Sequence, residues 1–275
     1  MQEVRFLFWN LNRNRPFEEI VNIVEHHQVD VLILAEVSFN LALLVVELAK
    51  KGQDFFHNPI SQCEKIKIIT RFNGEFLQPV LGNRRSSIDI LELPLFEKIL
   101  LASVHVPDKS HNTPDDQEEF CRNFAEQVRR IEIEKGIEKT VVVGDFNMNP
   151  FETIMIKSTG LHAISSSKIA EKVTRIVQEK EYKFFYNPMW SWLGDRKNEA
   201  IGSYYYNTSN HINYFWNTFD QVLIRPELIP NFDKESLKIL SSDGVKSLLT
   251  PNKRPDKSYS DHLPLLFTIK LNKPI

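Results

Sequence analysis

The sequence predicts an α/β protein in which two mixed β-sheets pack against each other and helices cover their outer sides. Strand-like and helix-like segments alternate in a similar order in the two halves of the chain, which is typical of layered α/β folds. The strand-like runs between residues 66 and 106 follow one another without a helix, which argues against a purely parallel sheet. The 275 residues, 42% of them hydrophobic, are enough for one large core, and no stretch has the composition of a linker. We therefore expect one domain over residues 1–275.

The first half of the chain supplies two strand and helix units and then a series of strands. Val4 to Trp9 is a short apolar run, and Pro16 then opens a helical pattern whose apolar residues share one face. Asp30 to Val37 predicts a buried strand, and Asn40 to Lys51 predicts a second amphipathic helix. Three more strands are predicted over Ile66 to Phe72, Ser87 to Leu93 and Ile99 to Val106.

The following helix has the clearest ends. Thr113 can cap it, Pro114 suits its first position, and Gly136 stops it. Acidic residues crowd its first turns, where the positive end of the helix dipole favours them. Its expected buried stripe consists of Phe120, Phe124, Val128 and Ile131. The last strands are predicted over Thr140 to Val143, Phe219 to Ile224 and Leu263 to Leu271.

Composition limits the classes of partner and compartment. Lysine and arginine total 34 against 36 acidic residues, so the molecule is not broadly basic and must hold any polyanion by local charge. Cys63 and Cys121 are too few for a disulfide framework. No run of eighteen apolar residues occurs, and the first fifteen residues lack the apolar core of a signal peptide. We expect a cytoplasmic protein with no stable membrane association.

Polar residues that can carry chemistry gather where the predicted strands begin or end. Alone, an Asp or Asn after a strand is usually a turn residue or a cap, so no single one of them predicts a site. Together they form an ordered set at strand ends, where loops carry function. The set is Asn10 and Asn12, Glu36, His105, Asp145 with Asn147, Asp220, and Asp261 with His262.

In this order the residues resemble the endonuclease/exonuclease/phosphatase superfamily, which includes pancreatic-type deoxyribonucleases and abasic-site endonucleases. The resemblance spans almost the whole chain, and its most specific parts are Gly-Asp-Phe-Asn at 144–147 and Ser-Asp-His at 260–262. It implies a four-layer sandwich, with two mixed sheets face to face and helices on both outer sides. It also implies metal-dependent hydrolysis of a phosphoester.

The resemblance implies a cation site built from oxygen ligands. Mg²⁺ prefers such ligands and keeps several waters, and Mn²⁺ is a possible substitute. Glu36 is the first-choice ligand, and by similarity to the family Asp261 and Asn10 lie close enough to assist. Asn12 stands where abasic-site enzymes commonly have Asp, which puts a second carboxylate on the first strand in doubt.

The resemblance also implies roles in proton transfer. His262 would deprotonate or orient the attacking water, and Asp220 would steady its ring. Asp145 and Asn147 would hold the nucleophile and a phosphate oxygen. His105 would protonate the leaving oxygen or bind the phosphate, although a histidine at a strand end beside Pro107 can also be purely structural.

Basic and aromatic residues bear on the substrate. Family members use an Arg near Arg84 or Arg85 for phosphate contact, and Arg13 belongs to a second basic loop beside the motifs. Each loop can equally be ordinary solvated surface charge, but their shared position beside the motifs favours a polyanion. Residues 250–258 contain three more cations. The segment from Tyr182 to Trp216 is crowded with aromatic residues, which are more often core or interface but can stack on bases.

Three functions compete. The first is a metal-dependent nuclease that hydrolyses DNA or RNA, with nucleic acid as its substrate. The second is a phosphatase or phospholipase acting on inositol phosphates or lipids; against it, the Trp-Cys-Asp-Arg signature of inositol-polyphosphate phosphatases is replaced here by Asn-Thr-Phe-Asp-Gln at 217–221. The third is an inactive binding protein of the same fold, which is disfavoured because none of the polar positions is missing.

Overall fold

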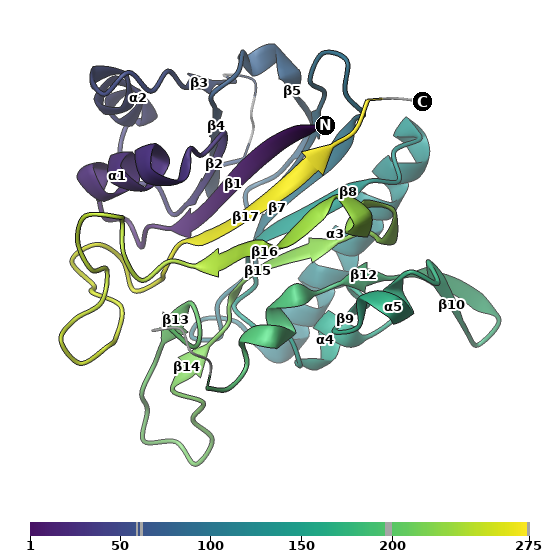
Figure 1. Ribbon diagram of the computed structural model, residues 1–275. Helices are drawn as coiled ribbons and strands as arrows, with labels where there is room; N and C mark the ends of the chain where they lie inside the picture. The colour runs from purple at the N-terminus through teal and green to yellow at the C-terminus, as the bar shows by residue number, and fades with distance from the viewer. Residues whose placement is uncertain (59, 61–62, 196–199, 274–275) are drawn as a thin grey trace.

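A computed structural model describes residues 1–58, 60, 63–195 and 200–273. Within them, the first large sheet has the strand order β16-β17-β1-β2-β4-β3 (Figure 1). In this sheet β1 is parallel to β2 and antiparallel to β17. The strands are β1 Gln2–Asn10, β2 Val31–Ala35, β3 Phe56–His57, β4 Ile66–Thr70, β16 Phe232–Ile239 and β17 Leu265–Leu271.

The second large sheet has the order β5-β6-β7-β8-β15-β12-β9 among the same described residues. Here β7 and β8 are parallel, while β8 and β15 are antiparallel. Its strands are β5 Leu77–Gly82, β6 Ser86–Leu91, β7 Ile99–His105, β8 Thr140–Asp145, β9 Ala163–Ile164, β12 Phe185–Tyr186 and β15 Asp220–Ile224. Two short hairpins stand outside both sheets: β10 Thr174–Val177 with β11 Lys180–Lys183, and β13 Tyr204–Tyr205 with β14 Trp216–Asn217.

Helices cover the outer faces of both sheets (Figure 1). The buried apolar residues of α1 and α2 share one core with both sheets, whereas α3 packs with the outer face of the seven-stranded sheet in a separate core. This arrangement confirms the predicted α/β fold with two mixed sheets between helices. None of the described helices is long and apolar enough to cross a bilayer. The helices are α1 Phe17–His27, α2 Leu41–Lys50, α3 Pro114–Lys135, α4 Thr153–Ile156 and α5 Ser167–Ala170, with 3-10 turns η1 Gly74–Phe76, η2 Pro188–Trp192 and η3 Pro226–Asn231.

The ends of α3 follow its sequence signals. The Thr113 hydroxyl accepts a hydrogen bond from the Asp116 backbone N–H, and the Asp116 carboxylate accepts one from the Thr113 backbone N–H. This reciprocal pair is a capping box. Gly136 ends the helix in the left-handed conformation, with φ of 63°. Both predicted ends of this helix are confirmed.

Other element ends differ from their predicted positions for local reasons. The strand predicted over Asp30 to Val37 ends at Ala35, because Glu36 takes φ of 53° and so leaves the extended conformation. Two long strands, β5 and β16, were not predicted. Their exposed and half-buried positions interrupt the apolar pattern, since each lies beside only one large neighbouring strand at an edge of its sheet.

The topology brings the ends of six chain segments together at one end of the sandwich. The register pairs Asn10 of β1 with Ala35 of β2, and His105 of β7 with Asp145 of β8. Because β15 is antiparallel to β8, its first residue, Asp220, also pairs with Asp145. The loop that enters β17 arrives beside β1 at the same end. Polar residues far apart in sequence therefore meet at one place.

Asp89 of β6 is buried in the protein, and its carboxylate accepts a hydrogen bond of 2.6 Å from the Ser87 hydroxyl. Burial raises the pKa of Asp89 to about 7, despite the opposing effect of that hydrogen bond. The folded protein therefore binds this proton more tightly than the unfolded chain does. Between pH 4 and about 7 the folded state holds more protons, so the free energy of unfolding falls as pH rises through this window.

We expect Asp89→Asn to remove this loss of stability. Each pH unit of difference between folded and unfolded pKa corresponds to about 1.4 kcal/mol, so the variant should gain on the order of 3 kcal/mol relative to wild type between pH 4.5 and pH 8. Urea unfolding at the two pH values measures the gain. Asp54→Asn, at an exposed position, serves as control. An equal pH dependence in wild type and Asp89→Asn would contradict the buried-carboxyl explanation.

Candidate functional site

Asp145, the last residue of β8, lies at the centre of the convergent strand ends. Its side chain is 1% exposed. Its Oδ2 accepts a hydrogen bond of 2.9 Å from Asn10 Nδ2 and lies 3.4 Å from Asn147 Nδ2. The same oxygen lies 3.6 Å from His105 Nε2 and 3.8 Å from His262 Nε2. The structure thus brings four of the predicted site residues around one carboxylate oxygen of a fifth, Asp145.

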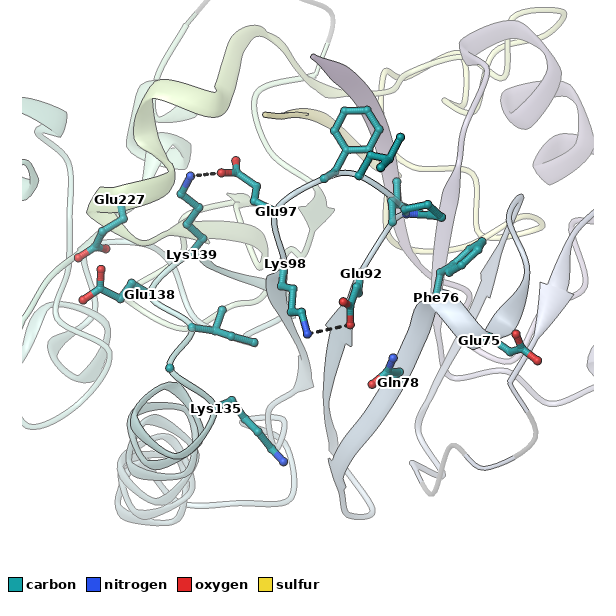
Figure 2. A pocket seen from close by; sticks show the side chains of 16 residues that line it. Glu75, Phe76, Gln78, Glu92, Glu97, Lys98, Lys135, Glu138, Lys139 and Glu227 are labelled. Carbon is teal, nitrogen blue, oxygen red and sulfur yellow. Dashed lines mark hydrogen bonds and ion pairs between the residues drawn. The ribbon is translucent and has the colours of Figure 1, made fainter. Parts of the chain in front are cut away.

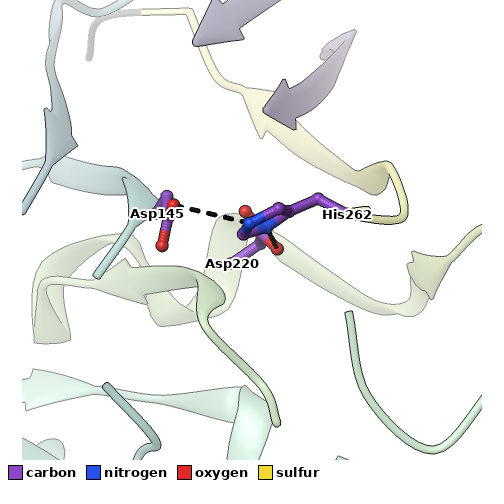
Figure 3. Close-up of side chains that lie close together, drawn as sticks. All are labelled: Asp145, Asp220 and His262. Atoms are coloured by element: carbon purple, nitrogen blue, oxygen red, sulfur yellow. Dashed lines mark hydrogen bonds and ion pairs between the residues drawn. The ribbon is translucent and has the colours of Figure 1, made fainter. Parts of the chain in front are cut away.

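His262 and Asp220 form a buried dyad beside Asp145 (Figure 3). The distance from His262 Nδ1 to Asp220 Oδ2 is 2.8 Å, which leaves Nε2 facing Asp145. Burial acts to lower the pKa of His262, but the carboxylates of Asp220, Asp145 and Asp261 outweigh it and raise the pKa to about 10. Burial raises the pKa of Asp145, which His262 and His105 partly oppose. A carboxylate on Nδ1 orients the ring and increases its basicity.

Glu36 and His105 form the other side of the site. His105 Nε2 lies 3.3 Å from Glu36 Oε1, and this contact is the main reason that the pKa of Glu36 is lowered. Lys65 and Arg13 lie farther from the Glu36 carboxylate, at 3.9 and 4.0 Å. Arg85 contacts the Nδ1 side of the His105 ring, with its Nη1 3.4 Å from His105 Nδ1. Glu36 is therefore held as a carboxylate, in the form that binds cations.

The backbone at this site adopts conformations that residues other than glycine seldom take. Positive φ values occur at Asn12, Glu36 and Asn147, at 44°, 53° and 50°. Such conformations cost energy and cluster at functional sites. Gly144 has a different role: a Cβ there would lie 1.9 Å from the Val104 carbonyl oxygen, so only glycine permits the close pairing of β7 and β8. This packing sets the position of Asp145.

Two groups of side chains have the chemistry of a metal site. Asp145, Asp220 and His262 each offer a ligand atom, and these atoms lie within 4.8 Å of one another. However, all three are buried and His262 Nδ1 is already bonded to Asp220. Glu36 and Asp261 are more accessible, with side chains 19% and 20% exposed. A hard cation that keeps several waters fits the more accessible carboxylates of Glu36 and Asp261 better than the buried dyad. Asn10 is itself buried, and its Oδ1 accepts a hydrogen bond from the Asn12 backbone N–H.

The predicted substrate-binding arginines lie at the rim and not in the centre. Arg84 is 70% exposed, and its Nε lies 3.6 Å from Glu64 Oε2. Arg13 is 73% exposed. Arg85 is the most enclosed of the three, because its guanidinium contacts both the ring and the backbone carbonyl of His105. Asp261 lies beside the dyad, with Oδ1 at 4.0 Å from His262 Nε2.

Sequence reasoning missed several residues that support the site. The Ser260 hydroxyl donates to the Asn10 carbonyl oxygen at 2.6 Å and accepts from the His262 backbone N–H, which ties the last loop to β1. The Asp220 backbone N–H donates to the Ser203 hydroxyl. The ring of Tyr204 lies against that of His262, with centroids 4.7 Å apart. Ser260 belongs to the quoted motif, but no sequence signal marks Ser203 or Tyr204.

A cavity of about 1050 Å³, whose lining is drawn in Figure 2, lies at the opposite end of the sandwich. Its lining includes residues 92–98 and 135–139, which precede β7 and β8, whereas the polar site lies where those strands end. Ion pairs join Lys98 to Glu92 and Lys139 to Glu97 across its wall. The cavity therefore has no part in the convergent site.

Comparisons with known proteins agree with the fold and the motifs. A model of the endonuclease/exonuclease/phosphatase family matches residues 7–262. No curated protein matches the chain by sequence. A family protein from Bacteroides thetaiotaomicron has a similar structure, with a TM-score of 0.57 and 12% identity over 98% of each chain. TDP2 from Caenorhabditis elegans gives 0.53 and 16% over 98% of this chain and 74% of the other. The endonuclease domain of TRAS1, a telomere-specific non-LTR retrotransposon, gives 0.52 and 13% over 98% and 99%.

Proposed function

Because this chain belongs to the endonuclease/exonuclease/phosphatase family, we propose that it is a divalent-metal-dependent phosphodiesterase that hydrolyses nucleic acid. The observation that carries the proposal is the group of polar side chains around Asp145 Oδ2, with the His262–Asp220 dyad on one side and the His105–Glu36 pair on the other. A nucleophile holder, a braced imidazole and an ionised carboxylate for a cation are the parts that phosphoester hydrolysis requires.

The proposed reaction is an in-line attack of water on phosphorus. Asp145 and Asn147 hold the water, and its proton passes to the pair formed by Asp145 and His262, which the Asp220 carboxylate braces. As the new P–O bond forms, the bond from phosphorus to the leaving oxygen breaks, and His105 or solvent returns a proton to that oxygen. A Mg²⁺ ion held by Glu36, Asp261 and Asn10 would neutralise charge on the phosphoryl oxygens.

Basic side chains near the site support a polyanionic substrate. Arg13 and Lys65 lie close to Glu36, and Arg85 contacts the Nδ1 side of His105. Arg84 adds an exposed cation next to Arg85. The Lys109 ammonium lies 5.7 Å above the ring of Phe219, the residue before Asp220. Since the net charge of the chain is −2, this local concentration of cations is what would attract a phosphate backbone.

The test is a cleavage panel with Mg²⁺ or Mn²⁺ and EDTA controls, offering plasmid, linear duplex, single-stranded DNA, RNA and phosphoinositides. We expect metal-dependent strand scission. Release of inorganic phosphate without scission would move the protein to phosphatase activity, and silence on every substrate, with intact folding, would favour a binding protein.

Glu36→Gln should weaken metal binding without unfolding the protein. Losing even a residue that supports a metal ligand costs about 10- to 100-fold in metal affinity or activity, so we expect the Mg²⁺ concentration for half-maximal scission to rise at least about 10-fold. A titration of scission against Mg²⁺ measures this. Glu47→Gln breaks the exposed pair with Lys50 and is the matched control. An unchanged Mg²⁺ requirement in Glu36→Gln would remove Glu36 from the proposed cation site.

A further inference from the structure

The hairpin β13–β14 and its connecting loop, residues 204–217, form a surface that we call the aromatic hairpin. Its sequence holds six Tyr, Phe and Trp residues and no Asp, Glu, Lys or Arg. Four of its apolar side chains are strongly exposed: Tyr206 by 54%, Ile212 by 74%, Tyr214 by 57% and Phe215 by 48%. Side chains this exposed contribute little to the core of the protein, so their exposure needs another explanation.

The base of the aromatic hairpin is fixed to the proposed catalytic site. Tyr204 forms an isolated β-bridge with His262, and the two rings lie 4.7 Å apart. Asn149, just after the Gly-Asp-Phe-Asn motif, donates to Asn217 Oδ1 at 2.8 Å. Hydrogen bonds from Asn213 to Asn207 and Thr208 hold the loop together. Ring positions on the hairpin are therefore set relative to the site.

The rings lead outward from His262. Phe219 lies 5.2 Å from Tyr204, and Tyr206 lies 6.5 Å beyond Tyr204 with ring planes only 15° apart. Figure 1 shows the hairpin extending from the end of the sandwich where β15 begins. This row of aromatic rings begins at the proposed catalytic site. It can therefore stack on successive flat groups of a chain-like ligand whose backbone enters that site.

Positive charge lies beside another ring of the hairpin, that of Tyr205. The guanidinium of Arg254 lies 4.5 Å from the Tyr205 ring centroid, and Lys257 is exposed nearby in sequence. The Lys257 carbonyl oxygen accepts a hydrogen bond from Asn14 Nδ2, which connects this loop to the loop of Arg13. Uncharged aromatic faces next to a basic loop match a ligand with flat bases and an anionic backbone.

We propose that the aromatic hairpin stacks unpaired bases that flank the phosphodiester in the site, so that the preferred substrate is single-stranded nucleic acid. In a duplex the faces of the bases are covered by their neighbours and only their edges are open, so exposed rings gain little from it. This inference rests on the proposed function. Stacking tolerates any base, so it predicts a strand preference without a sequence preference.

The test measures binding of wild type, Tyr206→Ala, Tyr206→Phe and Phe215→Ala by fluorescence anisotropy. The probes are a phosphorothioate single-stranded DNA, the same DNA as a duplex, and single-stranded RNA. Loss of one stacked base contact costs about 1–3 kcal/mol, or about 5- to 150-fold in affinity. We expect Tyr206→Ala and Phe215→Ala to bind both single strands at least about 5-fold more weakly, and Tyr206→Phe to bind like wild type. Ile176→Ala, at an exposed position on the β10–β11 hairpin, is the matched control.

The outcomes separate this inference from the proposed function. Wild-type scission with unchanged single-strand affinity in both alanine variants would overturn the role of the hairpin and leave the proposed function intact. An equal loss on single strand and duplex would also overturn it, because stacking on unpaired bases acts on the single strand alone. If wild type neither cleaves nor binds nucleic acid, both proposals fall. Self-association of wild type that Tyr206→Ala abolishes, without an effect on nucleic acid, would assign the surface to a second copy of the chain.

Discussion

His262→Ala is expected to lower kcat for phosphodiester hydrolysis by about 10²- to 10⁴-fold, the usual cost of losing a proton-transfer group. The imidazole is 7% exposed, bonded to Asp220 on one side and 3.8 Å from Asp145 Oδ2 on the other. Nothing else among the described side chains occupies that position between the two carboxylates. Single-turnover scission of a labelled oligonucleotide measures the loss directly.

Asp220→Asn tests whether hydrolysis requires the whole His262–Asp220 dyad or the His262 ring alone. The amide keeps the size of the side chain but removes the charge that orients and supports the imidazole, so a loss of about 10²-fold or more in kcat with little change in KM is expected. The control matched to His262→Ala is His111→Ala, because His111 forms a similar 2.8 Å contact with Asp108 but is 82% exposed. Full activity of His262→Ala in a folded protein would remove the dyad from the reaction.

The candidate site was predictable from sequence to the extent that it lies at strand ends. Asp145 follows the buried apolar run Val141 to Val143 with only Gly144 between them, a pattern that favours the end of a strand, and the family motifs supply the order in which such ends meet. The layered arrangement of sheets and helices could likewise be predicted, because strand-like and helix-like patterns alternate along the chain. Their convergence around Asp145 is a property of sheet topology, which single strands do not encode.

Other features could not be predicted, because they depend on contacts between distant segments. Tyr204 follows no motif, and its position beside His262 comes from a bridge between residues 58 positions apart. Asp89 lies in an apolar run, and no local pattern distinguishes a buried carboxyl there from one on a solvent-facing position. The edge strands β5 and β16 carry mixed patterns because only part of each is covered.

The second large effect expected concerns stability, at the buried ion pair between Arg225 and Glu132. Arg225 Nε and Nη2 donate to the two Glu132 oxygens at 2.7 and 3.0 Å, and the side chains are only 1% and 8% exposed. Thr140 donates to the same carboxylate, and the Arg225 guanidinium lies 3.7 Å above the Phe185 ring. The pair joins α3 to the end of β15, the strand that begins with Asp220.

Glu132→Ala should therefore lower the free energy of unfolding by about 3–5 kcal/mol, because it leaves the Arg225 charge buried without its partner. Removing both charges should cost less: Glu132→Leu combined with Arg225→Met is expected to recover much of the loss, since a buried pair can be replaced by apolar side chains of similar volume. Glu134→Ala breaks the exposed pair with Arg130 on the same helix and should cost less than about 1 kcal/mol. Urea unfolding of the four proteins measures these differences. A loss in Glu132→Ala no greater than that in Glu134→Ala would mean that solvent or a neighbouring group compensates Arg225, and that the contacts of α3 with the sheet rest on its apolar stripe alone.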